Sequence, residues 1–191
     1  MKKLITNISG ISKLTVEAYN KLSEVSEINY VSKFNVKVIS LKNEKEFLKE
    51  VRATAEHSFG LMLALIRKSK PAFLHTESYQ WNRNLFQGEE LYQKNIGILG
   101  FGRLGKITAS YAKAFGMNVF YYDKLEDETT NFVKCKTIDE LISKIDVLSI
   151  HITYDSTTEF ILNNSILEKI KKRIYIINTS RGGVVNDDDL L

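Results

Sequence analysis

Apolar residues in the first third of the chain recur at helical and strand spacings. Residues 44–68 have apolar side chains three and four positions apart, which predicts an amphipathic helix. After Phe59 this segment is apolar on nearly every face, as is typical of a helix buried between two domains or two subunits. We expect Pro71 to end it. Before it, the predicted elements are weaker: strands at Lys3–Thr6 and Val36–Ser40, and a helix at Leu14–Leu22.

From residue 94 onward, apolar runs alternate with amphipathic segments, whereas residues 72–93 are polar and are interpreted as irregular. The runs predict strands over 96–99, 118–122, 147–150 and 174–177. The segments predict helices over 104–115, 138–145, 165–171 and 187–191. We expect the first of these helices to bury Leu104, Ile107, Tyr111 and Phe115. Strands that alternate with helices predict an α/β fold, a Rossmann-type doubly wound parallel sheet covered on both faces.

Composition narrows the classes of protein. The chain has 191 residues, of which 43% are hydrophobic and 26% charged, so disorder, a coiled-coil rod and a disulfide scaffold are excluded. Cys135 is its one cysteine, which favours the reducing cytoplasm. The longest apolar run, Phe59–Ile66, is far shorter than the about 20 residues needed to span a membrane. The net charge of +4 comes from dispersed lysines. Charge dispersed in this way does not indicate a nucleic-acid partner. The sequence also lacks the paired His/Cys spacing that would indicate a metal site.

A glycine-rich turn carries the first candidate chemistry. Gly100, Gly102 and Gly105 follow a predicted buried strand and open a predicted helix. In that context G-x-G-x-x-G is the dinucleotide-binding fingerprint: a tight turn, room for a pyrophosphate, and close packing of helix on strand. Asp123 ends the next predicted strand, where a carboxylate accepts hydrogen bonds from the adenosine ribose and repels the 2′-phosphate of NADP. The predicted cofactor is therefore NAD. The alternative is that the glycines only form a tight turn.

A second candidate, Arg181, lies on the loop just beyond the predicted strand 174–177 and before two glycines. The carboxyl edge of such a sheet is where ligands bind, and an arginine there can hold a carboxylate through two parallel hydrogen bonds. On spacing alone, an ordinary surface arginine is the more common explanation. The assignment therefore depends on wider similarity.

Six stretches together resemble the D-isomer-specific 2-hydroxyacid dehydrogenases, a family that includes phosphoglycerate dehydrogenase and D-lactate dehydrogenase. They occur in the family's order across about residues 36–191. The stretches are ATAEHSFGL (53–61), WNR (81–83), GILGFGRLGK (97–106), AFGM (114–117), HIT (151–153) and NTSRG (178–182). The resemblance implies hydride transfer between NAD(H) and a 2-hydroxy or 2-keto acid, and pairing of subunits through the cofactor domain as a possible homodimer.

The resemblance also implies roles for individual residues. Arg103 and Leu104 would contact the pyrophosphate, and Asp123 the ribose. Arg181 would be the catalytic arginine, which binds the substrate carboxylate and polarises its 2-keto group. The remaining expected cofactor contacts are Ile152, Thr153, Thr158, Thr179, Ser180 and Arg181 itself. In the family a histidine donates a proton to the carbonyl, and a glutamate pairs with that histidine.

Two departures from the family pattern change the expectation. The family's glutamate and histidine follow the arginine motif, whereas His57, His75 and His151 all precede Arg181. The middle of the flavodoxin-like substrate domain is also not recognisable, with a join near Tyr30–Asn35. We therefore expect an incomplete form that binds NAD but lacks the catalytic Glu and His. Its parts would be a partial substrate domain (1–45), a crossover helix (46–70) and an NAD-binding Rossmann domain (71–191).

Three interpretations follow. The first is the cofactor domain of an NAD-dependent 2-hydroxyacid dehydrogenase. The second is a non-enzymatic NAD-binding or sensing module, because the same family contains transcriptional corepressors. The third is a degenerate product without a role, since half a substrate domain leaves apolar strands exposed.

Overall fold

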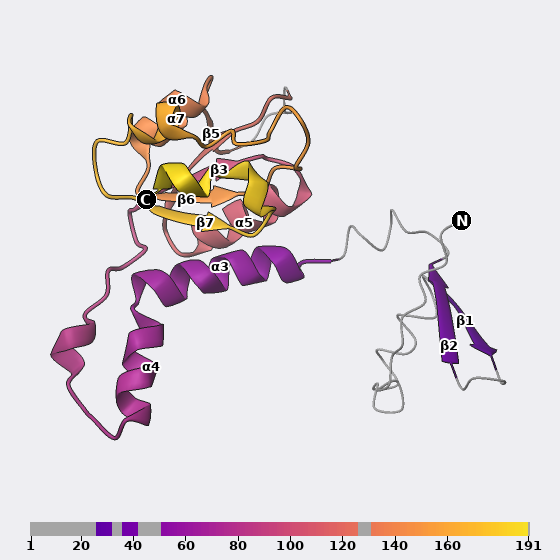
Figure 1. Ribbon diagram of the computed structural model, residues 1–191, viewed down its shortest axis with the longest axis horizontal. Helices are drawn as coiled ribbons and strands as arrows, with labels where there is room; N and C mark the ends of the chain where they lie inside the picture. Colours follow the sequence, from indigo (N-terminus) through magenta and orange to yellow (C-terminus); the bar gives the residue numbers. More distant parts are fainter. Residues whose placement is uncertain (1–25, 32–35, 42–50, 126–130, 191) are drawn as a thin grey trace. The chain divides into compact units, whose positions relative to one another are not determined.

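The computed structural model describes residues 26–31, 36–41, 51–125 and 131–190, and it divides the chain into two compact units, Met1–Val51 and Arg52–Leu191 (Figure 1). In the first unit, β1 (Ser26–Val31) pairs antiparallel with β2 (Val36–Leu41), so that Val31 lies opposite Val36. The strand predicted at 36–40 is confirmed, whereas β1 was not predicted. The elements predicted at 3–6, 14–22 and 44–50 lie outside the described residues.

The second unit is built on a five-stranded parallel sheet with the order β5-β4-β3-β6-β7, which confirms the predicted fold class. Its helices lie on both faces of the sheet (Figure 1). The strands are β3 (Asn95–Leu99), β4 (Asn118–Tyr122), β5 (Val133–Lys134), β6 (Val147–Ile150) and β7 (Tyr175–Asn178). The helices are α3 (Ala53–Ile66), α4 (Ser69–Glu77), α5 (Arg103–Ala114), α6 (Ile138–Lys144) and α7 (Asn164–Leu167), and the 3-10 helices are η2 (Arg83–Phe86), η3 (Gly182–Val184) and η4 (Asp187–Leu190).

Each face of the sheet has its own hydrophobic core, because successive strand residues point to opposite faces. Ile96 and Ile98 of β3 pack on the side of α3 and α5, together with Phe59 and Met62. On the other side, Leu148 and Ile150 of β6 join the residues of α6. This two-sided burial explains why the strands read as continuous apolar runs rather than alternating ones.

The prediction of which residues form the buried face of α5 was wrong. Its buried residues are small: Gly105, Thr108, Ala109 and Ala112. A Cβ atom at Gly105 would lie 2.1 Å from the carbonyl oxygen of Gly100, so the helix sits too close to the sheet for larger side chains. Tyr111 and Phe115 lie to the side instead, where both pack against Phe59 of α3 with ring centroids 5.9 and 4.8 Å away.

The segment interpreted as irregular contains α4 and η2, so that prediction was also wrong. The expectation that Pro71 ends the first helix was wrong too. Helix α3 ends at Ile66, Lys68 in the left-handed region with φ 53° separates it from α4, and Pro71 lies in the first turn of α4. A proline is tolerated there because its missing N–H would have no partner within the helix. No residue of α4 is buried, which is why the apolar pattern gave no signal for it.

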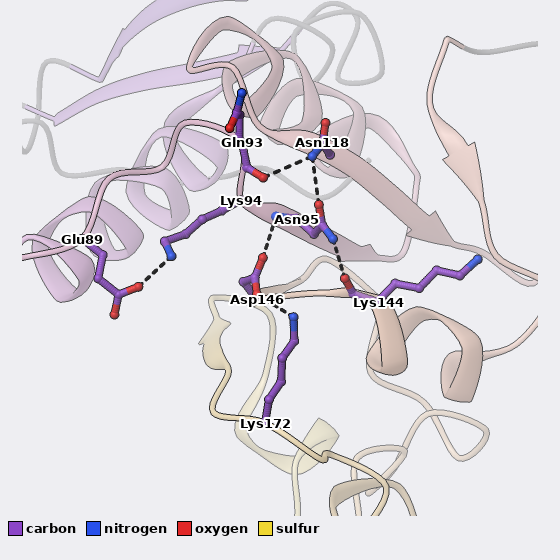
Figure 2. Close-up of polar contacts among 8 residues, drawn as sticks. All are labelled: Glu89, Gln93, Lys94, Asn95, Asn118, Lys144, Asp146 and Lys172. Carbon is purple, nitrogen blue, oxygen red and sulfur yellow. Dashed lines mark hydrogen bonds and ion pairs between the residues drawn. The ribbon is translucent and has the colours of Figure 1, made fainter.

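Side-chain hydrogen bonds connect the elements at the amino edge of the sheet (Figure 2). Asp146, just before β6, accepts from the backbone N–H of Asn95 at 2.8 Å and from Lys172 Nζ at 2.6 Å. The Asn95 side chain donates to the carbonyl of Lys144 and accepts from Asn118. Burial raises the pKa of Asp146, but Lys172 and the Asn95 N–H outweigh that effect, so the net pKa is lowered. The carboxylate thus ties the starts of β3 and β6 to the segment before β7.

Removing this carboxylate should cost more than removing an ordinary surface carboxylate. We expect Asp146→Ala to lower the free energy of unfolding by about 1–3 kcal/mol, because it leaves a partly buried N–H without its acceptor. Asp139→Ala is the matched control: Asp139 pairs with Lys169 at 2.7 Å with both side chains half exposed, and its loss should cost less than about 1 kcal/mol. Equal losses in urea titrations would contradict the bracing role of Asp146.

Candidate functional site

The loops that follow β3, β6 and β7 meet at the carboxyl edge of the sheet. Leu99, Ile150 and Asn178 are neighbours in the ladder, so the residues after them lie side by side. These loops and the start of α3 enclose a cavity of about 400 Å³. It is lined by Thr54, Leu104, Ile150, His151, Ile152, Thr153, Tyr154, Thr179, Ser180 and Arg181. Six residues predicted as site residues are therefore brought together on one cavity wall.

The glycine-rich turn has the geometry that its motif requires. Gly100 has φ +92°, which disfavours any side chain, and Gly105 packs directly on the Gly100 carbonyl. Gly102 is the N-cap of α5 and has no side-chain cap, and a Cβ built on it would meet no heavy atom within 4 Å. The open space at Gly102, beside a helix N-terminus that favours anions, is suited to a phosphate group. Arg103 and Leu104 form the first turn of that helix.

Asp123 follows β4, as predicted, but its carboxylate already has two backbone partners. Oδ2 accepts from the N–H of Phe101 at 2.7 Å, and Oδ1 accepts from the N–H of Leu125 at 2.9 Å. The side chain therefore braces the glycine-rich turn. A carboxylate has about four acceptor positions, so acceptor capacity toward a ribose remains.

Asn178 shapes the turn that carries Arg181. Its Oδ1 accepts from the backbone N–H and the hydroxyl of Ser180, and its Nδ2 donates to the carbonyl of Arg181 at 2.9 Å. The guanidinium of Arg181 is exposed and donates to the carbonyl of Ser180 at 2.8 Å. Its other N–H groups remain available to a ligand. A second cavity of about 580 Å³ shares Thr54, Thr179, Ser180 and Arg181 with the first and extends along α3 to His57 and Leu61.

A pair of hydroxyl groups joins α3 to this turn. Ser58 is buried, and its Oγ donates to the carbonyl of Thr54 at 2.8 Å and lies 2.5 Å from Thr179 Oγ1. Because Ser58 has one hydroxyl proton, and that proton goes to Thr54, Thr179 must be the donor between the two hydroxyls. Thr179 therefore presents only lone pairs to the cavities. Sequence reasoning gave Ser58 and Asn178 no role, although both lie within the quoted motifs.

Thr158 is one of six predicted cofactor contacts that line neither cavity; the others are Gly100, Gly102, Arg103, Gly105 and Asp123. It is buried outside the wall of both cavities, and its hydroxyl donates to the carbonyl of Thr153 at 2.7 Å and accepts from the N–H of Asp155 at 2.8 Å. It holds the loop that carries Ile152 and Thr153. His151, on the cavity wall, lies with Nε2 2.9 Å from the Ser149 hydroxyl, and burial lowers its pKa to about 4.

Comparison with known proteins agrees with both the fold and the sequence motifs. Residues 59–191 match the family model described as "D-isomer specific 2-hydroxyacid dehydrogenase, NAD binding domain". The chain belongs to this dehydrogenase family. It is 30% identical over 199 residues to D-3-phosphoglycerate dehydrogenase of Bacillus subtilis (strain 168), covering 96% of this chain and 37% of that protein. It is 34% identical over 138 residues to a hydroxypyruvate reductase of Thermotoga maritima, covering 72% of this chain and 45% of that one.

Solved structures of the family agree. D-lactate dehydrogenase from Aquifex aeolicus, complexed with NAD and lactic acid, is similar with a TM-score of 0.69 and 32% identity, over 74% of this chain and 43% of that one. The chain thus spans less than half the length of these three relatives. The matched part is the family's NAD-binding domain, and the open space at Gly102 fits that cofactor. Among the described residues, no helix is long and apolar enough to cross a membrane and no cluster of potential metal ligands occurs.

The lowered pKa of His151 predicts how stability depends on pH. An unfolded histidine titrates near pH 6.5, so between about pH 6.5 and about pH 4 the unfolded chain binds more protons than the folded one. Stability should be undiminished above this window and should fall through it, by up to about 1.4 kcal/mol per pH unit. His151→Gln cannot titrate and should flatten the slope. Parallel wild-type and variant curves in urea unfolding at several pH values would refute this prediction.

Proposed function

We propose that this chain supplies the cofactor half of a cytoplasmic, NAD-dependent oxidoreductase that acts on a 2-hydroxy or 2-keto acid. The carrying observation is that Arg181 lines the same cavity as Leu104, the second residue of the helix that the glycine-rich turn opens. A cationic group able to hold a carboxylate therefore stands next to an anion-binding helix terminus. Bound NAD would supply the hydride chemistry, while the protein supplies binding and orientation.

The binding roles in this proposal follow the local chemistry. Gly102 leaves room for the pyrophosphate, and Arg103 and Leu104 flank it. Asp123 accepts from the ribose hydroxyls and, as an anion, disfavours the 2′-phosphate of NADP. Ile152 and Thr153 line the nucleotide side, with Thr158 beneath them. Thr179, Ser180 and Arg181 face the nicotinamide side.

Arg181 has the catalytic role in the proposal. It holds the substrate carboxylate through paired N–H groups and polarises the 2-keto oxygen with its positive charge. The family's proton donor, a histidine paired with a glutamate, has no counterpart at His57, His75 or His151. The resemblance to the family also divides the chain into three parts. Residues 1–45 are part of a substrate domain, residues 46–70 are the crossover helix, and residues 71–191 are the cofactor domain. In the described part of the segment 46–70, α3 covers Ala53–Ile66 and packs on the sheet, and α4 begins at Ser69.

NADH binding tests the proposal directly. Wild-type protein should enhance NADH fluorescence in a saturable titration, with weaker binding of NADPH. Gly102→Ala should weaken NADH binding by about tenfold or more, because its methyl group occupies the space for the pyrophosphate. Gly60→Ala is the matched control: its Cβ also meets no atom within 4 Å, but it lies on the exposed side of α3. A folded wild-type protein that does not bind NADH would overturn the proposed function.

Turnover tests the expectation that this chain is an incomplete form. NADH oxidation is followed with a panel of 2-keto acids, and Arg181→Gln serves as the inactive comparison. Because no histidine of this chain matches the family's proton donor, we expect NADH binding with negligible oxidation, a result that the non-enzymatic sensing module of the same family shares. Brisk, arginine-dependent oxidation would contradict the incompleteness and exclude the sensing module.

We also propose that the protein is a homodimer that pairs through α4 and η2. This segment reaches away from the sheet (Figure 1), and its large apolar side chains are exposed. The exposed set is Phe73, Leu74, Tyr79, Trp81 and Leu85, of which Trp81 is 82% exposed. So many exposed apolar side chains in a segment of under 20 residues are typical of a protein interface.

Charge placed in this segment should prevent pairing. We expect wild-type protein to sediment as a dimer and Phe73→Glu/Trp81→Glu to sediment as a monomer with unchanged secondary structure, because burying an unpaired carboxylate is costly. Tyr92→Glu is the matched control, since Tyr92 is 64% exposed outside the segment. A monomeric wild-type protein at micromolar concentration would rule out this interface.

A further inference from the structure

The loop after β6 holds the arginine-bearing turn at Gly183. A Cβ atom built on Gly183 would lie 2.7 Å from Cε2 and 3.1 Å from Cζ of Tyr154, so the aromatic ring rests directly on the glycine backbone. The φ angle of Gly183 is not in the left-handed region, and thus space rather than backbone conformation demands a glycine here. Gly182, its neighbour, has no atom within 4 Å of the same built position.

The ring of Tyr154 is tethered at its hydroxyl end. Its hydroxyl donates to Glu159 Oε1 at 2.8 Å, a residue of the same loop. Although Tyr154 is 44% exposed, it lines the cavity that contains Arg181. The hydrogen bond to Glu159 limits the ring's freedom to swing into solvent, so the ring can act as a stop.

A second link joins the same two loops. The N–H of Phe160 donates to the carbonyl of Gly183 at 2.8 Å, and Phe160 has φ +45°. A non-glycine residue in the left-handed region is strained, and it persists where its surroundings fix it. Gly183 is therefore held at its Cα by the Tyr154 ring and at its carbonyl by Phe160.

The position of Gly183 is transmitted to Arg181 through a short, hydrogen-bonded turn. The carbonyl of Arg181 accepts from the N–H of Val184 at 3.3 Å and from Asn178 Nδ2 at 2.9 Å, and Val185 N–H donates to the carbonyl of Gly182 at 3.0 Å. These hydrogen bonds restrain the backbone between Arg181 and Gly183. A shift of one therefore moves the other.

We propose that Tyr154 is a positioning residue for Arg181: its ring is the stop on which the Gly182–Gly183 turn rests, and it sets how Arg181 faces the cavity. The inference depends on the proposed function, in which the Thr179–Arg181 turn contacts the cofactor. In this inference the loop after β6 positions Arg181 in addition to lining the nucleotide side. It also predicts that a glycine is needed at position 183 only while an aromatic ring occupies position 154.

A double-mutant cycle read by NADH affinity tests this coupling. Gly183→Ala should weaken NADH binding by about tenfold, whereas Gly60→Ala, whose Cβ meets no atom within 4 Å on the exposed side of α3, should change it by less than about twofold. In the Tyr154→Ala background, Gly183→Ala should cause less than about twofold further loss, because the clash is gone. Tyr154→Phe keeps the ring and should stay within about threefold of wild type. Melting temperatures should remain within a few degrees throughout.

The outcomes separate this inference from the proposed function. Wild-type protein that does not bind NADH refutes the proposed function. Normal wild-type binding together with equal effects of Gly183→Ala and Gly60→Ala refutes the inference alone. Additive losses in the double variant, or losses that follow the melting temperature, assign Tyr154 a purely structural role and also refute the inference.

Discussion

The close approach of α5 to β3 is the constraint on which the rest of the second unit depends. A Cβ atom built at position 105 would lie only 2.1 Å from the carbonyl oxygen of Gly100. The helix can come this near only because its inner face is Gly105, Thr108, Ala109 and Ala112. That approach places the helix N-terminus at the mouth of the site. It also forces Tyr111 and Phe115 sideways onto Phe59, so the same contact fixes α3 beside α5.

The two edges of the sheet are built for different tasks. At the amino edge, Asn95, Asn118 and Asp146 satisfy the backbone and one another, which leaves few polar groups for a ligand (Figure 2). At the carboxyl edge, side chains such as Asp123 and Asn178 brace individual turns, and the loops after β3, β6 and β7 leave a cavity. Parallel strands make this asymmetry possible, because all their carboxyl ends lie on one side.

Helix α3 is part of the site as well as part of the core. Thr54 lines both cavities, and Ser58 accepts a hydrogen bond from the hydroxyl of Thr179. This chain of hydroxyl groups leaves Thr179 as a hydrogen-bond acceptor toward any ligand. The orientation of one cavity residue is thus set by a helix more than 100 positions earlier in the sequence.

Local pattern alone determined the parallel sheet, the bounds of β3, β4 and β6 to within a residue, and the glycine-rich turn with Asp123 and Arg181 at strand ends. These features depend on residue type and short spacing, which a sequence displays directly. The tertiary structure decided the rest. It set the buried face of α5 by backbone proximity rather than by hydrophobicity, and it formed α4 from residues with no apolar face. It paired Ser58 with Thr179, and Tyr154 with Gly183, across loops distant in sequence. Such pairings are absent from any local pattern because they arise only when the strands that carry them are brought to one edge of the sheet.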